Sequence, residues 1–321
     1  MLALLFKVLL LSACAATPQS HIILSSPPHS LPLKFELSDT PFYPQTQYQC
    51  GPAALATLLK FYGQTVSIES LSKQMYIPDR QGSLQVELIS TARSHNMLPY
   101  PLKPQLLDLL TEIAAGNPVL VLQNLGFSWL PQWHYAVVVG YDIEENEIIL
   151  RSGTTKRWTS PFKVFERTWS RAESWGLALV PLGIIPKTAQ ASTYLKSAFP
   201  FEQLGRLNAA LIAYKAATLR WPELATPWLA FGNIAFSQKD WSLAVTNFSK
   251  AAKLEPNLLT SWNNLAYALS ANGCSKQANM ALQCGLKISP NDPNLVNSWD
   301  ELTQSSTPLD LPNCPKIECN L

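Results

Sequence analysis

The sequence Q-T-Q-Y-Q-C-G-P-A-A-L, residues 45–55, decides the fold of the first half of the chain. Polar residues give way here to an apolar run with helical spacing that stops at Gly63, and Pro52 suits a first helical turn, where a missing N–H costs nothing. We therefore expect a helix over residues 51–62 with Cys50 at its start. The positive end of the helix dipole should lower the pKa of the Cys50 thiol, which makes this cysteine a candidate nucleophile.

A candidate base for this thiol lies on an apolar strand much later in the chain. Residues 133–141 read W-H-Y-A-V-V-V-G-Y, so that His134 stands near the start of the strand. An imidazole beside a thiol can take its proton and return it to a leaving group. We therefore expect Cys50 to be the nucleophile and His134 to be the general base and acid, with Trp133 able to line the cleft beside them.

The pattern between residues 35 and 185 predicts one α+β domain. Four helical segments come first and four strand-like runs follow, which indicates helices segregated from an antiparallel sheet. The predicted helices span 51–62, 67–75, 83–93 and 103–114, and the predicted strands span 118–123, 133–141, 147–151 and 176–182.

The order of Cys-Gly-Pro on a helix, a Gly-Asn-Pro-Val strand and His-Tyr-Ala-Val-Val-Val-Gly-Tyr-Asp resembles the bacteriocin-processing, double-glycine-cleaving cysteine peptidases. The resemblance covers roughly residues 42–182 and implies a papain-like fold. It also implies that a glutamine shortly before the cysteine donates to the oxyanion. Gln45 corresponds best in its local sequence, and Gln47 and Gln49 are the alternatives.

The third member of the site does not follow the pattern of that family. Asp142 is eight residues from His134 on the same strand, about 27 Å away at roughly 3.4 Å per residue, so we expect it to open the following turn instead. The family usually carries an acid on the returning strand, where this chain has Ser152. Ser152 is therefore the expected orienting group, since Cys–His sites tolerate a neutral partner. A simple dyad and an inactive site are the alternatives.

The first residues of the chain predict export and lipidation. Residues 1–11 are almost wholly apolar, and Leu-Ser-Ala-Cys at 11–14 matches the lipobox of bacterial lipoproteins. This resemblance implies a signal peptide over 1–14, an acylated Cys14 and, with Ala15 next, an outer-membrane anchor facing the periplasm. The proline- and serine-rich residues 15–34 predict an extended spacer. A buried strand or an ordinary secretory signal is the alternative for the apolar run.

Composition limits the classes of ligand. Charged residues make up 14% of the chain, and Lys+Arg exceeds Asp+Glu only by 24 to 22, so nucleic acid is not an expected partner. Beyond Cys14 and Cys50 four cysteines remain, and export permits disulfides among them in any of three pairings. They are Cys274, Cys284, Cys314 and Cys319. No cysteines have zinc-ligand spacing with histidines nearby, so neither metal nor cofactor is expected.

The second half contains a repeat of 34 residues. Small, bulky and proline positions recur in register, as in Ala210, Ala244 and Ala278. This is the tetratricopeptide pattern, in which small residues let two helices approach and proline ends the second. We expect an all-α solenoid of three repeats with a capping helix over 193–303, an irregular tail over 304–321, and a concave face that binds a protein partner.

These observations favour a lipid-anchored cysteine peptidase that cleaves peptide bonds and binds a partner through its repeats. The alternative is an inactive peptidase-like scaffold that assembles an envelope complex, which the missing acid would favour. Acyl transfer or amide hydrolysis on another substrate is a further option, because the same side chains serve those reactions.

Overall fold

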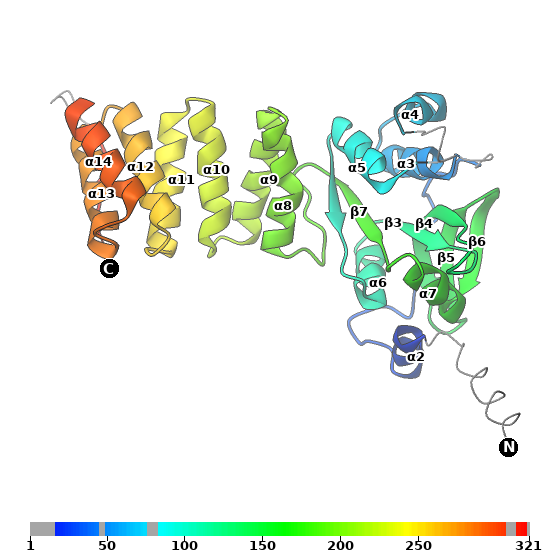
Figure 1. Cartoon of the computed structure of the whole chain (residues 1–321). Helices are drawn as coiled ribbons and strands as arrows, with labels where there is room; N and C mark the ends of the chain where they lie inside the picture. Colours follow the sequence, from blue (N-terminus) through cyan, green and yellow to red (C-terminus); the bar gives the residue numbers. More distant parts are fainter. Residues whose placement is uncertain (1–16, 45–48, 76–82, 306–312, 320–321) are drawn as a thin grey trace, which may run out of the picture. The chain divides into compact units, whose positions relative to one another are not determined.

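The chain forms two compact units in a computed structural model that describes residues 17–44, 49–75, 83–305 and 313–319 (Figure 1). The first unit extends to Pro181 and includes Pro186–Ala189, and the second comprises Leu182–Ile185 and the residues from Gln190 onward. Residues 182–189 therefore belong partly to one unit and partly to the other, and the predicted domain boundary at residue 185 falls within them.

An antiparallel sheet forms the middle layer of the first unit (Figure 1). Within the described residues it has seven strands, in the order β2-β7-β3-β4-β5-β6, with β1 paired to β4. β4 carries the apolar run of the sequence and is therefore the strand around which the others assemble. The strands are β1 Lys34–Glu36, β2 Met97–Pro101, β3 Val119–Asn124, β4 Trp133–Asp142, β5 Glu147–Ser152, β6 Thr155–Pro161 and β7 Gly176–Pro181.

Helices cover both faces of this sheet. α3, α4 and α5 lie over one face and α2, α6 and α7 over the other (Figure 1). On the face covered by α3, α4 and α5, apolar side chains of α3 pack against Tyr135, Val137 and Val139 of β4 and form a hydrophobic core. The predicted α+β class is therefore confirmed. The helices are α2 Pro18–Ser25, α3 Cys50–Phe61, α4 Ile68–Met75, α5 Gln85–Ser94, α6 Leu106–Ala114 and α7 Phe162–Ser170.

All four predicted helices and all four predicted strands are present, with ends shifted by a few residues. The sequence did not predict β1, β2, β6, α2 or α7. β2 and β6 are the two ends of the strand order, and edge strands lack the continuous apolar run of a central strand. β2 also contains Pro99 and Pro101, which a strand tolerates only at an edge.

The prediction of an extended spacer over residues 15–34 is wrong for the described residues. α2 occupies part of this segment, and Ile23 is buried. The buried carboxylate of Glu166 accepts hydrogen bonds from the backbone N–H groups of Gln19 (3.1 Å) and Ser20 (2.6 Å). The Gln19 side chain in turn accepts one from the N–H of Leu106, the first residue of α6. The first N–H groups of a helix need acceptors of this kind, because they have no partner within the helix. Glu166, the acceptor at the start of α2, is far away in the sequence, so the composition of residues 15–34 could not reveal it.

We expect Glu166→Ala to release α2 from the first unit. The substitution removes the acceptor for two helix-start N–H groups, at a cost of about 1–3 kcal/mol. Hydrogen exchange should therefore accelerate across Pro18–Ser25 while the amides of β4 stay protected. Glu144→Ala, which changes an exposed glutamate of the same unit, is the control and should leave α2 protected. Unchanged protection of α2 in Glu166→Ala would show that its apolar contacts hold it without this carboxylate.

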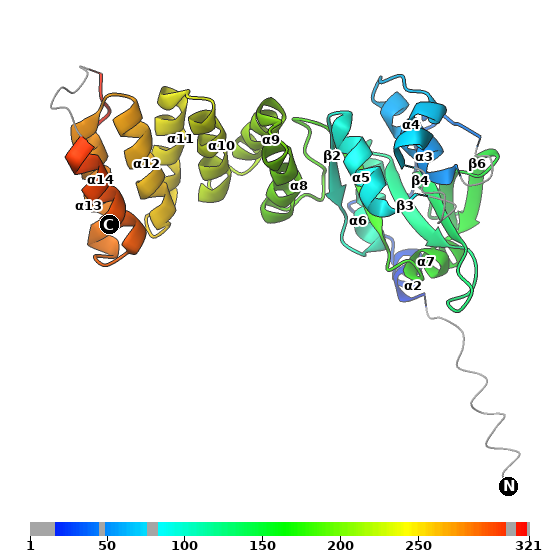
Figure 2. The ribbon, with the colours of Figure 1, turned by 45° about the horizontal axis from the view of Figure 1, so that its top comes forward.

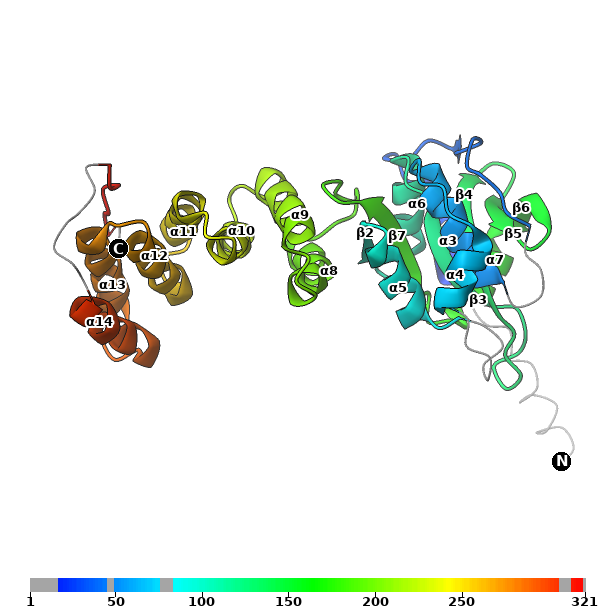
Figure 3. The ribbon, with the colours of Figure 1, turned by 90° about the horizontal axis from the view of Figure 1, so that it is seen from above.

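The second unit is a succession of antiparallel helix pairs, shown in order in Figure 2 and nearly end-on in Figure 3. The first helices of the pairs start at residues 191, 225 and 259, and α14 follows at 293, so the interval is 34 residues throughout. The all-α repeat prediction is therefore confirmed. The helices are α8 Ala191–Gln203, α9 Leu207–Arg220, α10 Ala225–Ser237, α11 Trp241–Leu254, α12 Leu259–Ala271, α13 Ser275–Ile288 and α14 Pro293–Ser305.

The small positions of the repeat are places where helices touch closely. A Cβ atom added to Gly232 on α10 would lie 2.5 Å from the ring of Phe248 on α11, which is itself buried. A Cβ added to Gly285 on α13 would lie 2.8 Å from Leu295 of α14. Real side chains do not approach so closely, so Gly232 and Gly285 are favoured by packing in their own copies of the repeat and not by a special backbone conformation.

We expect Gly232→Ala to destabilise the second unit. An alanine in a helix interior normally stabilises by about 1 kcal/mol over glycine, but here the added methyl group must displace a buried ring, at a cost of about 1–3 kcal/mol. The sign of the change should therefore reverse, which urea denaturation followed by circular dichroism would measure. Thr226→Ala, at an exposed position of the same helix, should change stability little. A Gly232→Ala variant more stable than the parent would contradict the close packing.

Two disulfides hold the C-terminal segment against the helices of the second unit. Cys274 pairs with Cys314 and Cys284 pairs with Cys319, which selects one of the three pairings that the sequence left open. Ile317, between the two bonded positions, is buried in the helical core. The predicted irregular tail over 304–321 begins slightly too early, because α14 extends to Ser305, and residues 313–319 have no regular secondary structure yet are covalently fixed.

Candidate active site

Cys50 is the first residue of α3, and its side chain is half-buried against the apolar core between α3 and β4. The next residue, Gly51, lies against the side chain of Ser83, which a Cβ at Gly51 would meet at 3.0 Å. This contact is tighter than ordinary van der Waals contact, so a larger residue at this position would require the side chain of Ser83 to shift. The glycine of the Cys-Gly-Pro motif is therefore favoured by close packing, and the proline by its place in the first turn of the helix.

The thiol of Cys50 contacts the strand that carries His134. The backbone of Tyr135, the residue after His134, hydrogen-bonds this thiol, as do the backbones of Gly51 and Cys50 itself. Burial nevertheless outweighs these hydrogen bonds and raises the pKa of the Cys50 thiol. The expectation of a lowered thiol pKa is therefore wrong, because desolvation at this helix start exceeds the stabilisation of the thiolate by nearby N–H groups.

His134 contacts the predicted third residue. Its Nε2 lies 2.9 Å from Oγ of Ser152, at the end of the neighbouring strand β5. Burial lowers the pKa of His134, so the neutral imidazole is favoured at neutral pH. Since Nε2 is engaged by the hydroxyl, Nδ1 is the ring nitrogen that remains for another partner.

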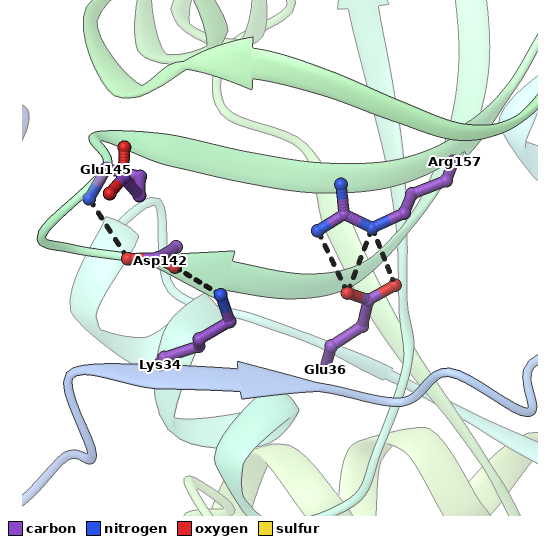
Figure 4. A network of polar contacts seen from close by, with 5 residues as sticks. All are labelled: Lys34, Glu36, Asp142, Glu145 and Arg157. Carbon is purple, nitrogen blue, oxygen red and sulfur yellow. Dashed lines mark hydrogen bonds and ion pairs between the residues drawn. The ribbon is translucent and has the colours of Figure 1, made fainter.

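Asp142 lies at the far end of β4 and takes part in a separate charge network (Figure 4). Its carboxylate lies 2.7 Å from Nζ of Lys34 and accepts a hydrogen bond from the backbone N–H of Glu145 in the following turn. These hydrogen bonds hold the pKa of Asp142 below its usual value. On the same face Glu36 pairs with Arg157 at 3.0 Å. The network fastens β1 to β4 and β6, and the predicted turn role of Asp142 is confirmed.

We expect Ser152→Ala to alter the titration of His134. If the Ser152 hydroxyl accepts from Nε2–H, it favours the protonated ring, so its removal should lower the His134 pKa by several tenths of a unit up to about one. Nuclear magnetic resonance titration of the ring protons would measure this shift. Asp142→Asn should leave the same titration unchanged, because eight strand residues separate the two side chains. An equal shift in both variants would point to a general loosening of β4 instead.

Of the three glutamine candidates for the oxyanion donor, the structure describes only Gln49. Gln45 and Gln47 lie outside the described residues. Gln49 precedes α3 directly, at the position before Cys50. The backbone of this helix start remains a source of N–H donors next to the thiol, since the first N–H groups of a helix have no intrahelical acceptor.

Arg151 is a residue near the site that the sequence did not single out. Its buried guanidinium donates hydrogen bonds to the carbonyl oxygens of Ser38 (3.0 Å) and Thr40 (3.1 Å). It thereby holds the segment that leads toward Cys50 against β5, beside Ser152. No local signal could reveal this role, because a single arginine in a strand is usually exposed and its acceptors are more than a hundred residues away.

The loop between β3 and β4 gives the site an exposed apolar neighbour. Trp133 is 54% exposed, and on the alternating strand it shares a face with Tyr135. The loop is held from within by the Asn124 side chain, which accepts from the N–H groups of Gly126 and Gln132. Its exposed side chains are Leu125, Phe127, Trp129 and Leu130, with Phe127 and Trp129 stacked. The role of Trp133 in lining a cleft beside Cys50 and His134 stays a prediction.

Within the described ranges, no three His, Cys, Asp or Glu side chains gather in a group that could hold a metal ion. Of the predicted site residues, the structure places the His134 imidazole against the Ser152 hydroxyl, and the Cys50 thiol against the backbone of Tyr135, the residue after His134.

Comparison with known proteins shows what the first unit is similar to. Residues 37–176 match the model of the Peptidase_C39 like family. A solved C39-like peptidase from Bacillus anthracis is 18% identical, with a TM-score of 0.40, over 48% of this chain and 99% of its own. Comparison with curated protein sequences gives no match.

The second unit has solved relatives among tetratricopeptide domains. The first such domain of Spaghetti (RPAP3), bound to an HSP90 peptide, is 16% identical with a TM-score of 0.34 and covers 36% of this chain and 90% of its own. The TPR2B domain of yeast Sti1, in a complex with Hsp70, gives 16% identity and a TM-score of 0.34 over 36% of this chain and 98% of its own.

The first unit therefore resembles the C39-like peptidases over residues 37–176, in agreement with the resemblance noted in the sequence. It is followed in the same chain by a run of helices with the 34-residue interval of the tetratricopeptide pattern.

Proposed function

We propose that this protein is a cysteine peptidase in which Cys50 attacks a peptide carbonyl and His134 transfers the proton. The observation that carries the proposal is the contact of the Cys50 thiol with the backbone of Tyr135, directly after His134, while Ser152 engages the far nitrogen of the ring. A nucleophile, a base and an orienting group thus come from α3, β4 and β5 of one peptidase-like fold.

The proposed reaction assigns one step to each of these residues. Sγ of Cys50 forms a bond to the carbonyl carbon, and its proton passes to Nδ1 of His134, since Nε2 faces Ser152. The oxyanion takes hydrogen bonds from the Cys50 N–H and from a glutamine, for which Gln45 is the first candidate. Collapse of the tetrahedral intermediate breaks the C–N bond, and His134 gives its proton to the departing amine. Water then hydrolyses the thioester with His134 as base.

The resting pair is neutral in this proposal. Burial raises the pKa of Cys50 and lowers that of His134, so both shifts disfavour a thiolate–imidazolium pair before substrate binds. A neutral imidazole is the form that can accept a proton, and it does so as the S–C bond forms. Ser152 supplies no negative charge to stabilise the imidazolium, so we expect catalysis slower than with a carboxylate at this position.

We expect the raised pKa of Cys50 to govern its alkylation. The thiolate is the reactive form, so the rate with iodoacetamide should lie below that of a free cysteine near pH 7 and should rise with pH through and beyond the ordinary thiol range near about 8.5. Rates measured from pH 6 to 10 on the intact chain, with Cys50→Ala as the unreactive control, would test this. A plateau already at pH 6 would contradict a buried neutral thiol.

Cleavage itself separates the proposal from its alternative. In a peptide library followed by mass spectrometry, the parent should give new amino termini, Cys50→Ala should give none, and His134→Ala should lose roughly a hundredfold or more in rate. Absence of cleavage in the parent would favour an inactive peptidase-like scaffold in an envelope complex. The hydroxyl of Ser152 at the place of the usual acid is the observation that favours this second function.

The remaining expectations are part of the same proposal. We infer that Cys14 is acylated and anchors the protein in the bacterial outer membrane facing the periplasm, on the strength of the lipobox at residues 11–14. Within the ranges that the structure describes, no helix has the length and apolarity to cross a membrane. The repeats are inferred to bind a protein partner, since the tetratricopeptide domains of Spaghetti and Sti1 are recorded in complexes with peptides or partner proteins.

A further inference from the structure

The second unit contains a cavity of about 420 Å³ that is bounded on one side by the C-terminal segment. Helices α10, α11 and α12 supply the other sides. Its apolar lining includes the indoles of Trp228 and Trp262 and the side chain of Ile317. A cavity of this size falls within the range of ligand pockets in proteins and holds a large apolar side chain with its neighbours.

The wall made by the C-terminal segment is covalently fixed. The lining residues 315–318 lie between Cys314 and Cys319, and each of these cysteines is bonded to α13 or to the residue just before it. Because both ends are tied, this wall cannot leave the helices while the disulfides are intact. Ile317 is buried within the same segment and adds an apolar anchor. The segment therefore completes a preorganised cavity, which lowers the entropy cost of binding.

The rim of the cavity carries an excess of positive charge. Lys250, Lys253 and Lys316 line it, together with one carboxylate, Glu318. Lys316 pairs with Glu318 at 2.6 Å, and Lys253 also helps to lower the pKa of Glu318, so the rim carries three ammonium groups against one carboxylate and keeps a net positive charge that attracts an anion. Lys250 lies over the ring of Trp228, 6.0 Å from its centroid, so a cation already stands beside the apolar lining.

We propose that this cavity binds an acidic peptide segment of a partner protein. An apolar side chain of the peptide enters between Trp228 and Trp262, and its neighbouring carboxylates face Lys250 and Lys253. Buried aromatic anchors supply affinity at such sites, and complementary charge selects the partner and excludes basic sequences. The proposal is independent of catalysis by Cys50. It also differs from binding on a concave face of the repeats, since α11 and the disulfide-tied segment form much of the site.

Fluorescence anisotropy with labelled pentapeptides tests this proposal on the intact chain carrying Cys50→Ala, which prevents cleavage of the probes. The probes are Asp-Asp-Trp-Asp-Asp, Lys-Lys-Trp-Lys-Lys and Asp-Asp-Ser-Asp-Asp. We expect the first to bind at least about tenfold more tightly than the other two, and its affinity to fall as salt is raised.

Charge reversal on α11 locates the site. The double variant Lys250→Glu, Lys253→Glu should weaken the acidic tryptophan peptide by about tenfold or more. Lys196→Glu, at an exposed position on α8 of the same unit, is the control and should bind as the parent does. Equal losses in control and double variant would overturn the proposal, as would equal affinity for all three peptides or no binding below about 1 mM.

The disulfide-tied wall is tested separately. The double variant Cys314→Ser, Cys319→Ser frees the C-terminal segment, and we expect it to weaken the same peptide by about fivefold or more while the helical circular dichroism is kept. Unchanged affinity in that variant would contradict a site that includes residues 315–318. If the variant loses its helical signal, the lysine variants decide the question.

Discussion

The antiparallel pairing of β4 with β3 and β5 is the constraint on which the first unit depends. β4 is the longest strand of the described sheet, and its register with β5 brings the end of that strand, and hence Ser152, within reach of His134. The same strand presents Tyr135 to the core under α3, and its backbone to the thiol of Cys50. A shift of one residue in this register would turn each of these side chains to the opposite face.

The two ends of β4 lie in different electrostatic environments. Around Asp142 the charges are paired and partly exposed, and they fasten β1 to its neighbours. Around Cys50 and His134 burial dominates, and it disfavours both charged forms. The first arrangement stabilises the fold with ion pairs. The second favours the neutral thiol and the neutral imidazole.

The second unit obtains its order from a different source. Its helices repeat at a fixed interval, and close contacts such as that between Gly232 and Phe248 allow each pair to nest. A short array of repeats exposes its terminal helices, because each repeat contacts only its neighbours. Here α14 covers one end, and two disulfides draw the following segment back onto the helices. The covalent bonds fix a segment with no regular secondary structure, whose own apolar burial is limited to residues such as Ile317.

The sequence by itself determined the features that depend on local or periodic pattern. The helix start at Cys50, the apolar strand with His134, the exclusion of Asp142 and the repeat all follow from spacing and from elementary strand and helix geometry. The tertiary structure decided what depends on long-range partners. Burial raises the pKa of the Cys50 thiol, whereas the helix start alone predicted a lowered value. Glu166 binds the start of a helix in the segment predicted to be an extended spacer. The packing of the helices brings together one of the three possible sets of cysteine pairs. Each of these outcomes depends on desolvation or contact between residues far apart in the chain, which composition and spacing do not encode.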